Sequence, residues 1–357
     1  MNIRLLKYID AVVGAAAVAL LPSAARPSDN GVLTSIIIIR PGGIGDAVLM
    51  APMMRTIKER FPSARITVLA EQRNAGVFTL LPEVSQLYRY DRPAEFLQAL
   101  AGNYDAVIDT EQWHRLSAAA ARLIRARHRI GFDTNERRRM FTAAIPYFQE
   151  QYESASFMNL LRPFGIDRHS DAAEAPFLTV PSAAVEKIRR LIEPLDGKPY
   201  IVIFPGASIA ERTWGTARFR VVAQELDESG FATVVVGSRE DRFDGDMIAG
   251  MKGLNLAGKT DLAETAAVIE RSKLLISGDS GVLHLAVGLD VPTVSLFGAG
   301  IEKKWAPQGE THPVLNHHLP CSPCTSFGTT PACSDGARCM SEITPAEVLA
   351  AAARLLN

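Results

Sequence analysis

The sequence predicts an α/β protein made of two doubly wound domains, each with a parallel sheet covered by helices on both faces. Three observations support this fold class. From Ser35 onward, apolar β-branched runs alternate with helical patterns, as in parallel sheets buried on both sides. The alternation occurs twice, before and after a polar, proline-containing passage at 180–199. A chain of 357 residues also has the length of about two domains.

We assign the first domain to residues 31–185 and the second to residues 199–357. In the first domain we expect strands at 35–39, 66–70, 106–109 and 129–131, and helices at 47–60, 93–101 and 116–125. In the second we expect strands at 200–204, 233–236, 274–277 and 293–297, and helices at 217–228, 261–270, 281–288 and 345–356. Two such domains facing each other would form a cleft at the carboxyl ends of their strands, where open α/β sheets bind ligands.

Composition and charge exclude several classes of protein. With 47% hydrophobic and 22% charged residues, the chain is neither disordered nor a polytopic membrane protein. The net charge of −1 provides no overall field for binding nucleic acid. A charged partner must therefore meet a local patch. One candidate patch is arginine-rich and lies at 115–139; within it, Arg137, Arg138 and Arg139 could bind phosphates, although charge runs are also typical of solvated faces.

The first thirty residues, called the leader here, differ from the rest of the chain. Arg4 and Lys7 precede an apolar run from Ile9 to Leu21, and small residues follow. This order resembles a secretory signal. The run is too short to span a bilayer as a helix, for which roughly 20 residues are needed. An uncleaved helix lying in the membrane interface, with its cations at the head groups, is the other interpretation.

All four cysteines lie near the carboxyl terminus, in the loop 321–339. Their spacing is C-x2-C-x8-C-x5-C, formed by Cys321, Cys324, Cys333 and Cys339. Four thiolates could hold a structural zinc ion and brace this loop. Two local disulfides or four free thiols are the alternatives.

The first strand-to-helix turn contains three glycines and an acid. It reads Arg40-Pro-Gly-Gly-Ile-Gly-Asp46, and Glu71 ends the following strand. A dinucleotide fingerprint G-x-G-x-x-G fails here because Val48 occupies the third glycine position. Asp46 would also repel a pyrophosphate at the helix N-terminus. At the bottom of a cleft, Asp46 could instead accept a proton from a hydroxyl, or it could cap the helix.

Two further turns carry polar residues at the same edge of the second domain. The turn at 277–281 presents small residues at a helix N-terminus, which suits phosphate oxygens, and His284 follows one helical turn after Ser280. The same residues would also occur in a capped helix with a packed histidine that binds no ligand. Arg212 follows the strand that ends at Phe204 and could neutralise a departing diphosphate.

Taken together and in this order, these elements resemble the family of ADP-heptose:lipopolysaccharide heptosyltransferases and their relatives. The resemblance covers about Ser35 to Asn357, and its most specific pieces are the segments 39–46, 278–286 and 292–298. It implies two facing Rossmann-like domains, the GT-B fold, and an inverting glycosyltransferase without a catalytic cofactor. An NAD-dependent oxidoreductase using Glu71, and a non-catalytic envelope binding protein of the same fold, are the alternatives.

The resemblance also implies roles for individual residues. Asp46 matches the catalytic base, with Gly43 and Gly45 beside it on the acceptor side. The expected donor-site residues are Arg212, Asp279, Ser280, Gly281 and His284 at the diphosphate, Thr260 near the base, and Glu240 or Asp241 at the ribose. The implied donor is ADP-heptose, and the implied acceptor is a lipid-linked anionic glycan. The implied location is the cytoplasmic face of the inner membrane, which favours the leader as an anchor and weakens the disulfide alternative.

Overall fold

The structure is a computed structural model that describes residues 8–25, 33–167, 175–327 and 329–356. The chain divides into two compact units, Met1–Ala173 and Glu174–Asn357, called unit 1 and unit 2 here. Each unit contains one six-stranded sheet with only parallel pairs between its strands. The fold class expected from the sequence is therefore confirmed.

Unit 1 is built on a sheet with the strand order β3-β2-β1-β4-β5-β6. Its strands are β1 (Ser35–Arg40), β2 (Arg65–Ala70), β3 (Val84–Arg89), β4 (Asn103–Asp109), β5 (Arg125–Asp133) and β6 (Ala143–Pro146). Its helices are η1 (Asp10–Gly14), α2 (Ala15–Leu20), α3 (Ile44–Leu49), α4 (Ala51–Arg60), η2 (Ala75–Leu80), α5 (Pro93–Ala101), α6 (Arg115–Leu123), η3 (Glu136–Met140), α7 (Glu153–Asn159) and η4 (Arg162–Phe164).

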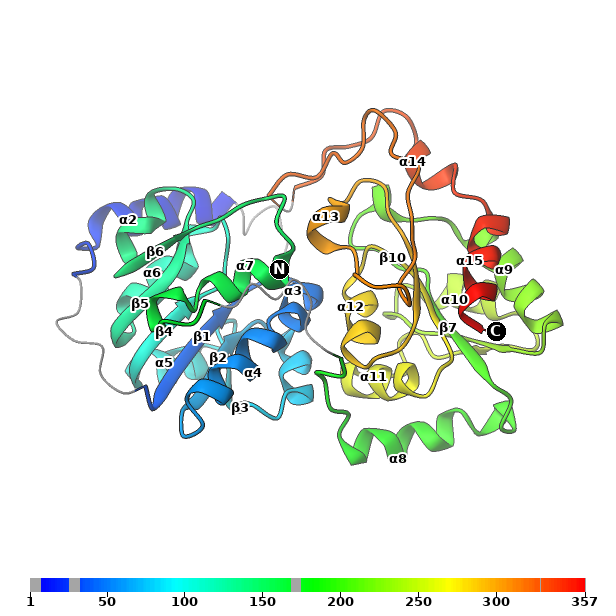
Figure 1. Ribbon diagram of the computed structural model, residues 1–357, viewed down its shortest axis with the longest axis horizontal. Helices are drawn as coiled ribbons and strands as arrows, with labels where there is room; N and C mark the ends of the chain where they lie inside the picture. The colour runs from blue at the N-terminus through cyan, green and yellow to red at the C-terminus, as the bar shows by residue number, and fades with distance from the viewer. Residues whose placement is uncertain (1–7, 26–32, 168–174, 328, 357) are drawn as a thin grey trace. The chain divides into compact units, whose positions relative to one another are not determined.

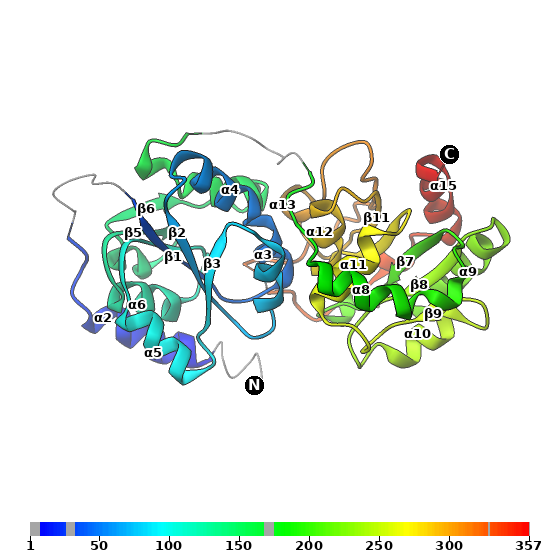
Figure 2. The same ribbon diagram turned by 90° about the horizontal axis from the view of Figure 1, so that it is seen from below.

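The two faces of this sheet are covered by different helices. Figure 2 shows α4 on one side of the sheet and α5 with α2 on the other. Ile37 and Ile39 of β1 are buried in one cluster with Ala99 of α5 and Ala118 of α6. Side chains alternate along a strand, so Ile36 and Ile38 face the opposite layer. All four isoleucines are at most 2% exposed, which explains the uninterrupted apolar run of this strand.

The leader packs on unit 1 where it is described. Tyr8 to Leu20 are helical, and α2 lies beside α6 (Figure 1). Val18 is 1% exposed within the core cluster of the sheet. No helix of the described residues is long and apolar enough to cross a membrane. Arg4 and Lys7, the cations expected at the head groups, lie outside the described residues.

Unit 2 repeats the plan, with the strand order β12-β11-β10-β7-β8-β9. Its strands are β7 (Tyr200–Phe204), β8 (Ala232–Val235), β9 (Leu254–Asn255), β10 (Leu275–Gly278), β11 (Thr293–Leu296) and β12 (Val314–Leu315). Its helices are α8 (Ser182–Leu191), η5 (Glu193–Leu195), η6 (Ala210–Arg212), α9 (Thr216–Glu228), α10 (Arg242–Ala249), α11 (Leu262–Glu270), α12 (Gly281–Gly288), α13 (Glu302–Trp305), α14 (Arg338–Ser341) and α15 (Pro345–Leu356). The passage expected between the domains forms α8, which packs against α11.

Both sheets have a point at which the chain reverses its direction of strand addition. In unit 1 this point lies between β1 and β4, and in unit 2 it lies between β7 and β10. The loops that follow two such strands diverge to opposite faces and leave a crevice at the carboxyl edge, where open α/β sheets bind ligands. The strand order therefore directs attention to the loops after β1, β4, β7 and β10.

Candidate active site

The loop after β1 places Asp46 in the first turn of α3. Gly43 precedes the helix as its N-cap residue, and Gly45 lies within its first turn. Gly42 has a φ of +99°, a backbone conformation that is unfavourable for residues with a side chain. A Cβ built on Gly43 would meet no described atom within 4 Å, so space is left beside this turn. The Asp46 side chain is 24% exposed, and it does not cap the helix.

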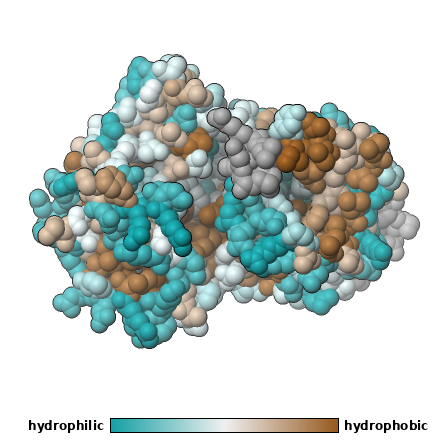
Figure 3. Space-filling model, turned by 180° about the vertical axis from the view of Figure 1, so that it is seen from behind, coloured by the Kyte–Doolittle hydropathy of each residue, from teal (hydrophilic) through white to brown (hydrophobic). Residues whose placement is uncertain are grey.

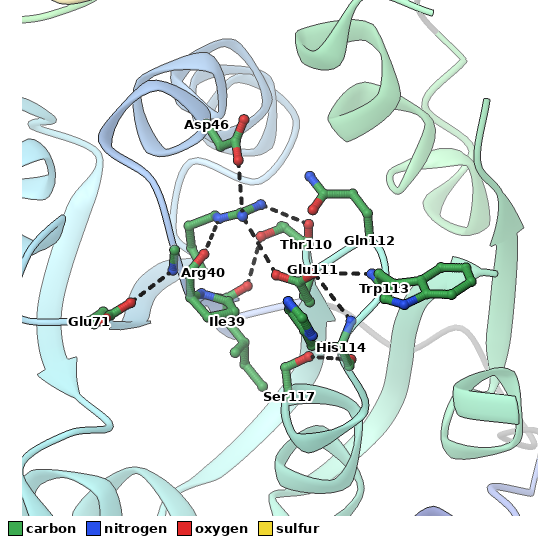
Figure 4. Close-up of polar contacts among 12 residues, drawn as sticks. Ile39, Arg40, Asp46, Glu71, Thr110, Glu111, Gln112, Trp113, His114 and Ser117 are labelled. Carbon is green, nitrogen blue, oxygen red and sulfur yellow. Dashed lines mark hydrogen bonds and ion pairs between the residues drawn. The ribbon is translucent and has the colours of Figure 1, made fainter. Parts of the chain in front are cut away.

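Arg40 connects Asp46 to the loop after β4. Figure 4 shows its guanidinium between Asp46 and the segment containing Thr110 and Glu111. Nη2 lies 3.2 Å from Asp46 Oδ2 and 3.7 Å from Glu111 Oε2, and Nη1 donates to the Thr110 carbonyl at 3.0 Å. The Arg40 side chain is 2% exposed, and its guanidinium carbon lies 5.8 Å from the ring centre of Phe157. A buried cation is thus shared by two carboxylates at the carboxyl edge of the sheet.

Glu111 remains an ionised acid although it is buried. Burial alone would raise its pKa, but Arg40, with smaller contributions from His114 and Arg137, lowers the pKa below its ordinary value. Its other oxygen, Oε1, accepts the backbone N–H groups of Trp113 at 3.0 Å and His114 at 3.3 Å (Figure 4). The carboxylate therefore holds the loop that leads into α6 while it orients Arg40. Sequence reasoning assigned no role to either residue: Arg40 lies within the motif segment 39–46 but only its glycines and acid were considered, and Glu111 belongs to no motif segment.

The three arginines expected to bind acceptor phosphates lie in different surroundings, and only Arg137 is buried. Arg137 is fully buried, with Nη2 2.5 Å from Asp109 Oδ2 and Nη1 bonded to the Glu111 carbonyl, so it cannot contact an acceptor. Burial raises the pKa of Asp109 more than Arg137 lowers it. Arg138 lies 3.6 Å from Asp133, and the carbonyl of Arg139 accepts the backbone N–H of Ala24 in the leader. The expectation for Arg137 is wrong, because the fold buries this arginine in an ion pair with Asp109.

The acid expected for a dinucleotide is already engaged within its own loops. Glu71 Oε2 accepts the backbone N–H of Gly42 at 3.2 Å and the Nε–H of Arg73 at 2.9 Å. These contacts tie the loop after β2 to the first turn. Together with the missing third glycine, they do not favour an NAD-dependent oxidoreductase.

In unit 2, the loop after β10 forms the turn expected for phosphate oxygens. Ser280 is the N-cap of α12, and its Oγ accepts the N–H of Leu283 at 3.3 Å. Gly281 opens the helix without a side chain, and His284 is 3% exposed within it. The capped helix and packed histidine are both present. This does not oppose anion binding, because the remaining N–H groups of the first turn still point out of the helix end.

Arg212 and Asp279 are brought together from the loops after β7 and β10. Arg212 Nη1 lies 2.9 Å from Asp279 Oδ2, and its side chain is 17% exposed. Its Nε is buried and has no hydrogen-bond partner among the described residues. The guanidinium carbon also lies 5.9 Å from the ring centre of Trp305. An arginine with an unused N–H donor beside a helix N-terminus can donate hydrogen bonds to phosphate oxygens.

A third element of this cluster was not expected from the sequence. Lys304 is 2% exposed, and its ammonium lies 5.8 Å from the ring centre of Trp305. A Cβ at Gly300 would come within 2.1 Å of Asp279 Oδ2, so a side chain at this position of the loop after β11 would displace the Asp279 carboxylate. In the sequence, this element could have been found from the Gly-Ala-Gly segment at 298–300 and the Lys303-Lys304-Trp305 run that follows it.

The two acids considered for a ribose differ in their surroundings. The carboxylate of Asp241 accepts the N–H and hydroxyl of Ser238, each at 2.7 Å, so it stabilises its own loop. Glu240 is exposed, and hydrogen bonds from its own N–H and from Ser238 lower its pKa. Thr260 lies before α11, with its hydroxyl 2.9 Å from that of Thr265. Of the two acids, Glu240 retains a carboxylate that a ligand can reach.

The four cysteines are free thiols, and the structure does not support the expected zinc site. Among the described residues, no three histidine, cysteine or acidic side chains come together in a way that could hold a metal ion. Cys321 and Cys333 are exposed, Cys324 is half-buried, and Cys339 is buried in the core cluster of unit 2. Burial, with smaller effects from the neighbouring cysteines, raises the pKa of Cys324 and Cys339. The loop is braced by packing and hydrogen bonds, such as that from Ala337 N–H to Cys333 Sγ at 3.3 Å.

Comparison with known proteins relates this geometry to a family. A family model described as "Glycosyltransferase family 9 (heptosyltransferase)" matches residues 94–333. Lipopolysaccharide heptosyltransferase 3 of Escherichia coli is 29% identical over 289 residues, covering 74% of this chain and 83% of its own. The E. coli ADP-heptose lps heptosyltransferase II structure is similar with a TM-score of 0.75 and 22% identity, covering 90% of this chain and 98% of that one. E. coli heptosyltransferase WaaC, solved with ADP-2-deoxy-2-fluoro heptose, matches with a TM-score of 0.69 and 17% identity, covering 90% and 99%. The protein is a glycosyltransferase, and the chain belongs to glycosyltransferase family 9, the heptosyltransferases.

Proposed function

We propose that the protein transfers heptose with inversion from ADP-heptose to a hydroxyl of a lipopolysaccharide core or a related lipid-linked glycan. The donor assignment is supported by the relatives, whose names and bound ligands include lipopolysaccharide heptosyltransferase and an ADP-heptose analogue. The observation that carries the proposal is the pairing of Asp46 with the buried Arg40, at the reversal point of the first sheet. That pair holds a partly exposed carboxylate in a fixed position at the carboxyl edge of the sheet.

One displacement accounts for the reaction. The acceptor hydroxyl gives its proton to the Asp46 carboxylate, and its oxygen forms a bond to the anomeric carbon of the donor. The bond between that carbon and the diphosphate oxygen breaks, and ADP leaves with the electron pair. Attack from the face opposite the leaving group inverts the anomeric centre. No cofactor takes part in this step.

In unit 2 we assign the leaving group to the Arg212–Asp279 cluster. Arg212 and the N–H groups at the start of α12 would stabilise the negative charge that develops on the diphosphate. Asp279 holds Arg212 in place and remains close enough to accept from a sugar hydroxyl. Glu240 would accept from the ribose hydroxyls, and backbone groups near Thr260 would contact the base. We also propose that transfer takes place at the cytoplasmic face of the inner membrane, because the proposed acceptor is anchored there.

Replacement of the base tests this proposal. We expect Asp46→Asn to reduce kcat by roughly 100-fold or more, the range that a positioned base contributes, because the amide cannot accept the proton. The dissociation constant for ADP, measured by calorimetry, should stay within about twofold, since Asp46 belongs to unit 1. Glu71→Gln is the matched control, being a carboxylate at the same sheet edge, and it should retain turnover. Full activity of Asp46→Asn would remove the residue from this role.

A further inference from the structure

The outward side of the leader helix is apolar throughout. It is formed by residues that are exposed along Tyr8–Leu20, namely Tyr8, Ala11, Val12, Val13, Ala16, Ala19 and Leu20, and is called the outer leader face. Four of these are large apolar side chains, exposed by 67% at Tyr8, 53% at Val12, 52% at Val13 and 85% at Leu20. In Figure 3, hydrophobic residues, coloured brown, gather on the surface of unit 1. Contiguous exposed apolar surface of this kind marks an interaction site.

The opposite side of the same helix is fixed to unit 1 by polar contacts. Asp10 Oδ1 accepts the backbone N–H groups of Arg115 and Leu116, each at 2.8 Å, and so caps the start of α6. A Cβ at Gly14 would lie 3.0 Å from Arg115 Cβ, so the helix approaches α6 closely at this glycine. The buried Val18 completes the contact. The outer leader face cannot rotate inward without breaking these contacts.

The charged groups that contact the segment directly after this helix are arginines, and the acid Glu136 on the neighbouring η3 is paired with Arg115. Asp10 is the sole acid in the sequence from 8 to 25, and it is buried at 5% exposure. Arg122 Nε donates to the Pro22 carbonyl at 2.9 Å, and Arg139 exchanges hydrogen bonds with Ser23 and Ala24. An apolar helix face with arginines beside it complements a surface that is apolar inside and anionic at its rim.

We propose that the outer leader face binds the head-group region of a membrane rich in anionic lipid, and that this contact is how the protein reaches a lipid-borne acceptor. A second copy of the chain fits less well. Thirteen helical residues span about 20 Å at the helical rise per residue. A single helix face of that length offers little area for a stable protein interface, which buries roughly 1,200–2,000 Å² in total.

The position of the leader within unit 1 relates the proposed membrane contact to the proposed reaction. α6, which Asp10 caps, begins directly after the loop in which Glu111 pairs with Arg40. Arg40 in turn pairs with Asp46. The start of the leader helix therefore lies at the carboxyl edge of the sheet, the edge that carries the proposed base. This step alone rests on the proposed function, whereas membrane binding itself does not.

Vesicle sedimentation of the full chain tests the binding surface. The probes are vesicles of phosphatidylethanolamine with about one third phosphatidylglycerol, compared with pure phosphatidylcholine, over a salt series. We expect binding to the anionic vesicles that weakens with salt and is much lower on phosphatidylcholine. Val12→Glu/Val13→Glu should reduce the partition coefficient by roughly tenfold or more, because two charges would enter the interface. Phe243→Glu/Met247→Glu, which adds the same charges at exposed positions of α10 in unit 2, should bind as the parent does.

Several results would overturn the inference. These are equal binding of the leader variant and the parent, loss of binding in the α10 variant, or no binding of the parent to either vesicle. A lipid-free dimer that Val12→Glu/Val13→Glu dissociates would identify a second copy as the partner instead. Thermal unfolding of each variant guards against a folding defect. Transfer to a soluble acceptor fragment should survive in the leader variant while transfer to a vesicle-borne acceptor falls, so failure of the membrane contact is distinguishable from failure of the proposed reaction.

Discussion

At the scale of single residues, the unexpected participant is Arg40. A guanidinium that is 2% exposed and lies within 4 Å of two carboxylates sets the charge balance around Asp46. A buried arginine is always protonated and holds its partners in a fixed geometry. Arg40 is therefore a positioning residue: it orients the proposed base without contacting substrate.

This arrangement predicts a loss of turnover when the cation is removed. Arg40→Gln removes the group whose Nη2 lies 3.2 Å from Asp46 Oδ2, so the carboxylate loses its fixed position. We expect kcat to fall by roughly tenfold to 100-fold in steady-state kinetics, the range that misplacement of a reacting group can cost, while the dissociation constant for ADP should stay within about twofold. Arg40→Lys should restore part of kcat, and full turnover of Arg40→Gln would contradict the assignment.

Some site residues could be predicted from the sequence because short-range rules place them. A glycine-rich turn between a buried strand and a helix puts Asp46 and Asp279 at the carboxyl edge whatever the rest of the chain does. Their partners could not be predicted in the same way. The roles of three residues depend on burial between loops that are far apart in the sequence: Arg40, Glu111 and Lys304. In the same way, the fold places the neighbouring arginines 137–139 in unrelated contacts.

At the scale of elements, the leader shows that a local pattern does not reveal tertiary packing. Its composition is that of a signal or an anchor, and the described part is also a helix that caps and covers α6. The strands missed in the sequence were β3, β6, β9 and β12, all at or near sheet edges, where short or polar segments give no apolar run. The helix expected at 47–60 is divided at Met50, because Pro52 has no N–H to donate to the carbonyl of Val48 and so cannot continue α3 into α4.

The cap on α6 predicts a measurable and pH-dependent stability. Burial alone would raise the pKa of Asp10, but the hydrogen bonds from His114, Leu116 and Arg115 lower it below its ordinary value of 3.8. Asp10→Ala should therefore cost about 1 kcal/mol, a typical value for an N-cap, in urea unfolding at neutral pH. The difference from the parent should persist down to the ordinary pKa and vanish as the pH falls through the lowered value. Asp10→Asn, which keeps an acceptor oxygen, should lose less; equal losses would argue against capping.

At the scale of the whole molecule, the two units have separate cores. Trp214, Phe219 and Ile276 belong to the cluster of unit 2, whereas Ile37, Val107 and Phe141 belong to that of unit 1. The residues proposed for donor binding all lie in unit 2, and the proposed base Asp46 lies in unit 1. Sequence reasoning could predict that there are two units because the alternation of strands and helices repeats. It placed the end of the first at residue 185, whereas unit 1 ends at Ala173 and α8 packs on unit 2.

Separate cores predict that the donor nucleotide stabilises one unit more than the other. ADP at 100 times its dissociation constant adds about 2.7 kcal/mol to the unit that binds it. Hydrogen exchange should therefore slow in peptides from β7, β10 and α12, while peptides from β1 and α6 should change little. Arg212→Met should abolish this protection, because the phosphate loses its cation, and Asp46→Asn should leave it intact. Protection of β1 and α6 equal to that of α12 would mean that the two units unfold as one, and the assignment of donor binding to unit 2 alone would then have to be abandoned.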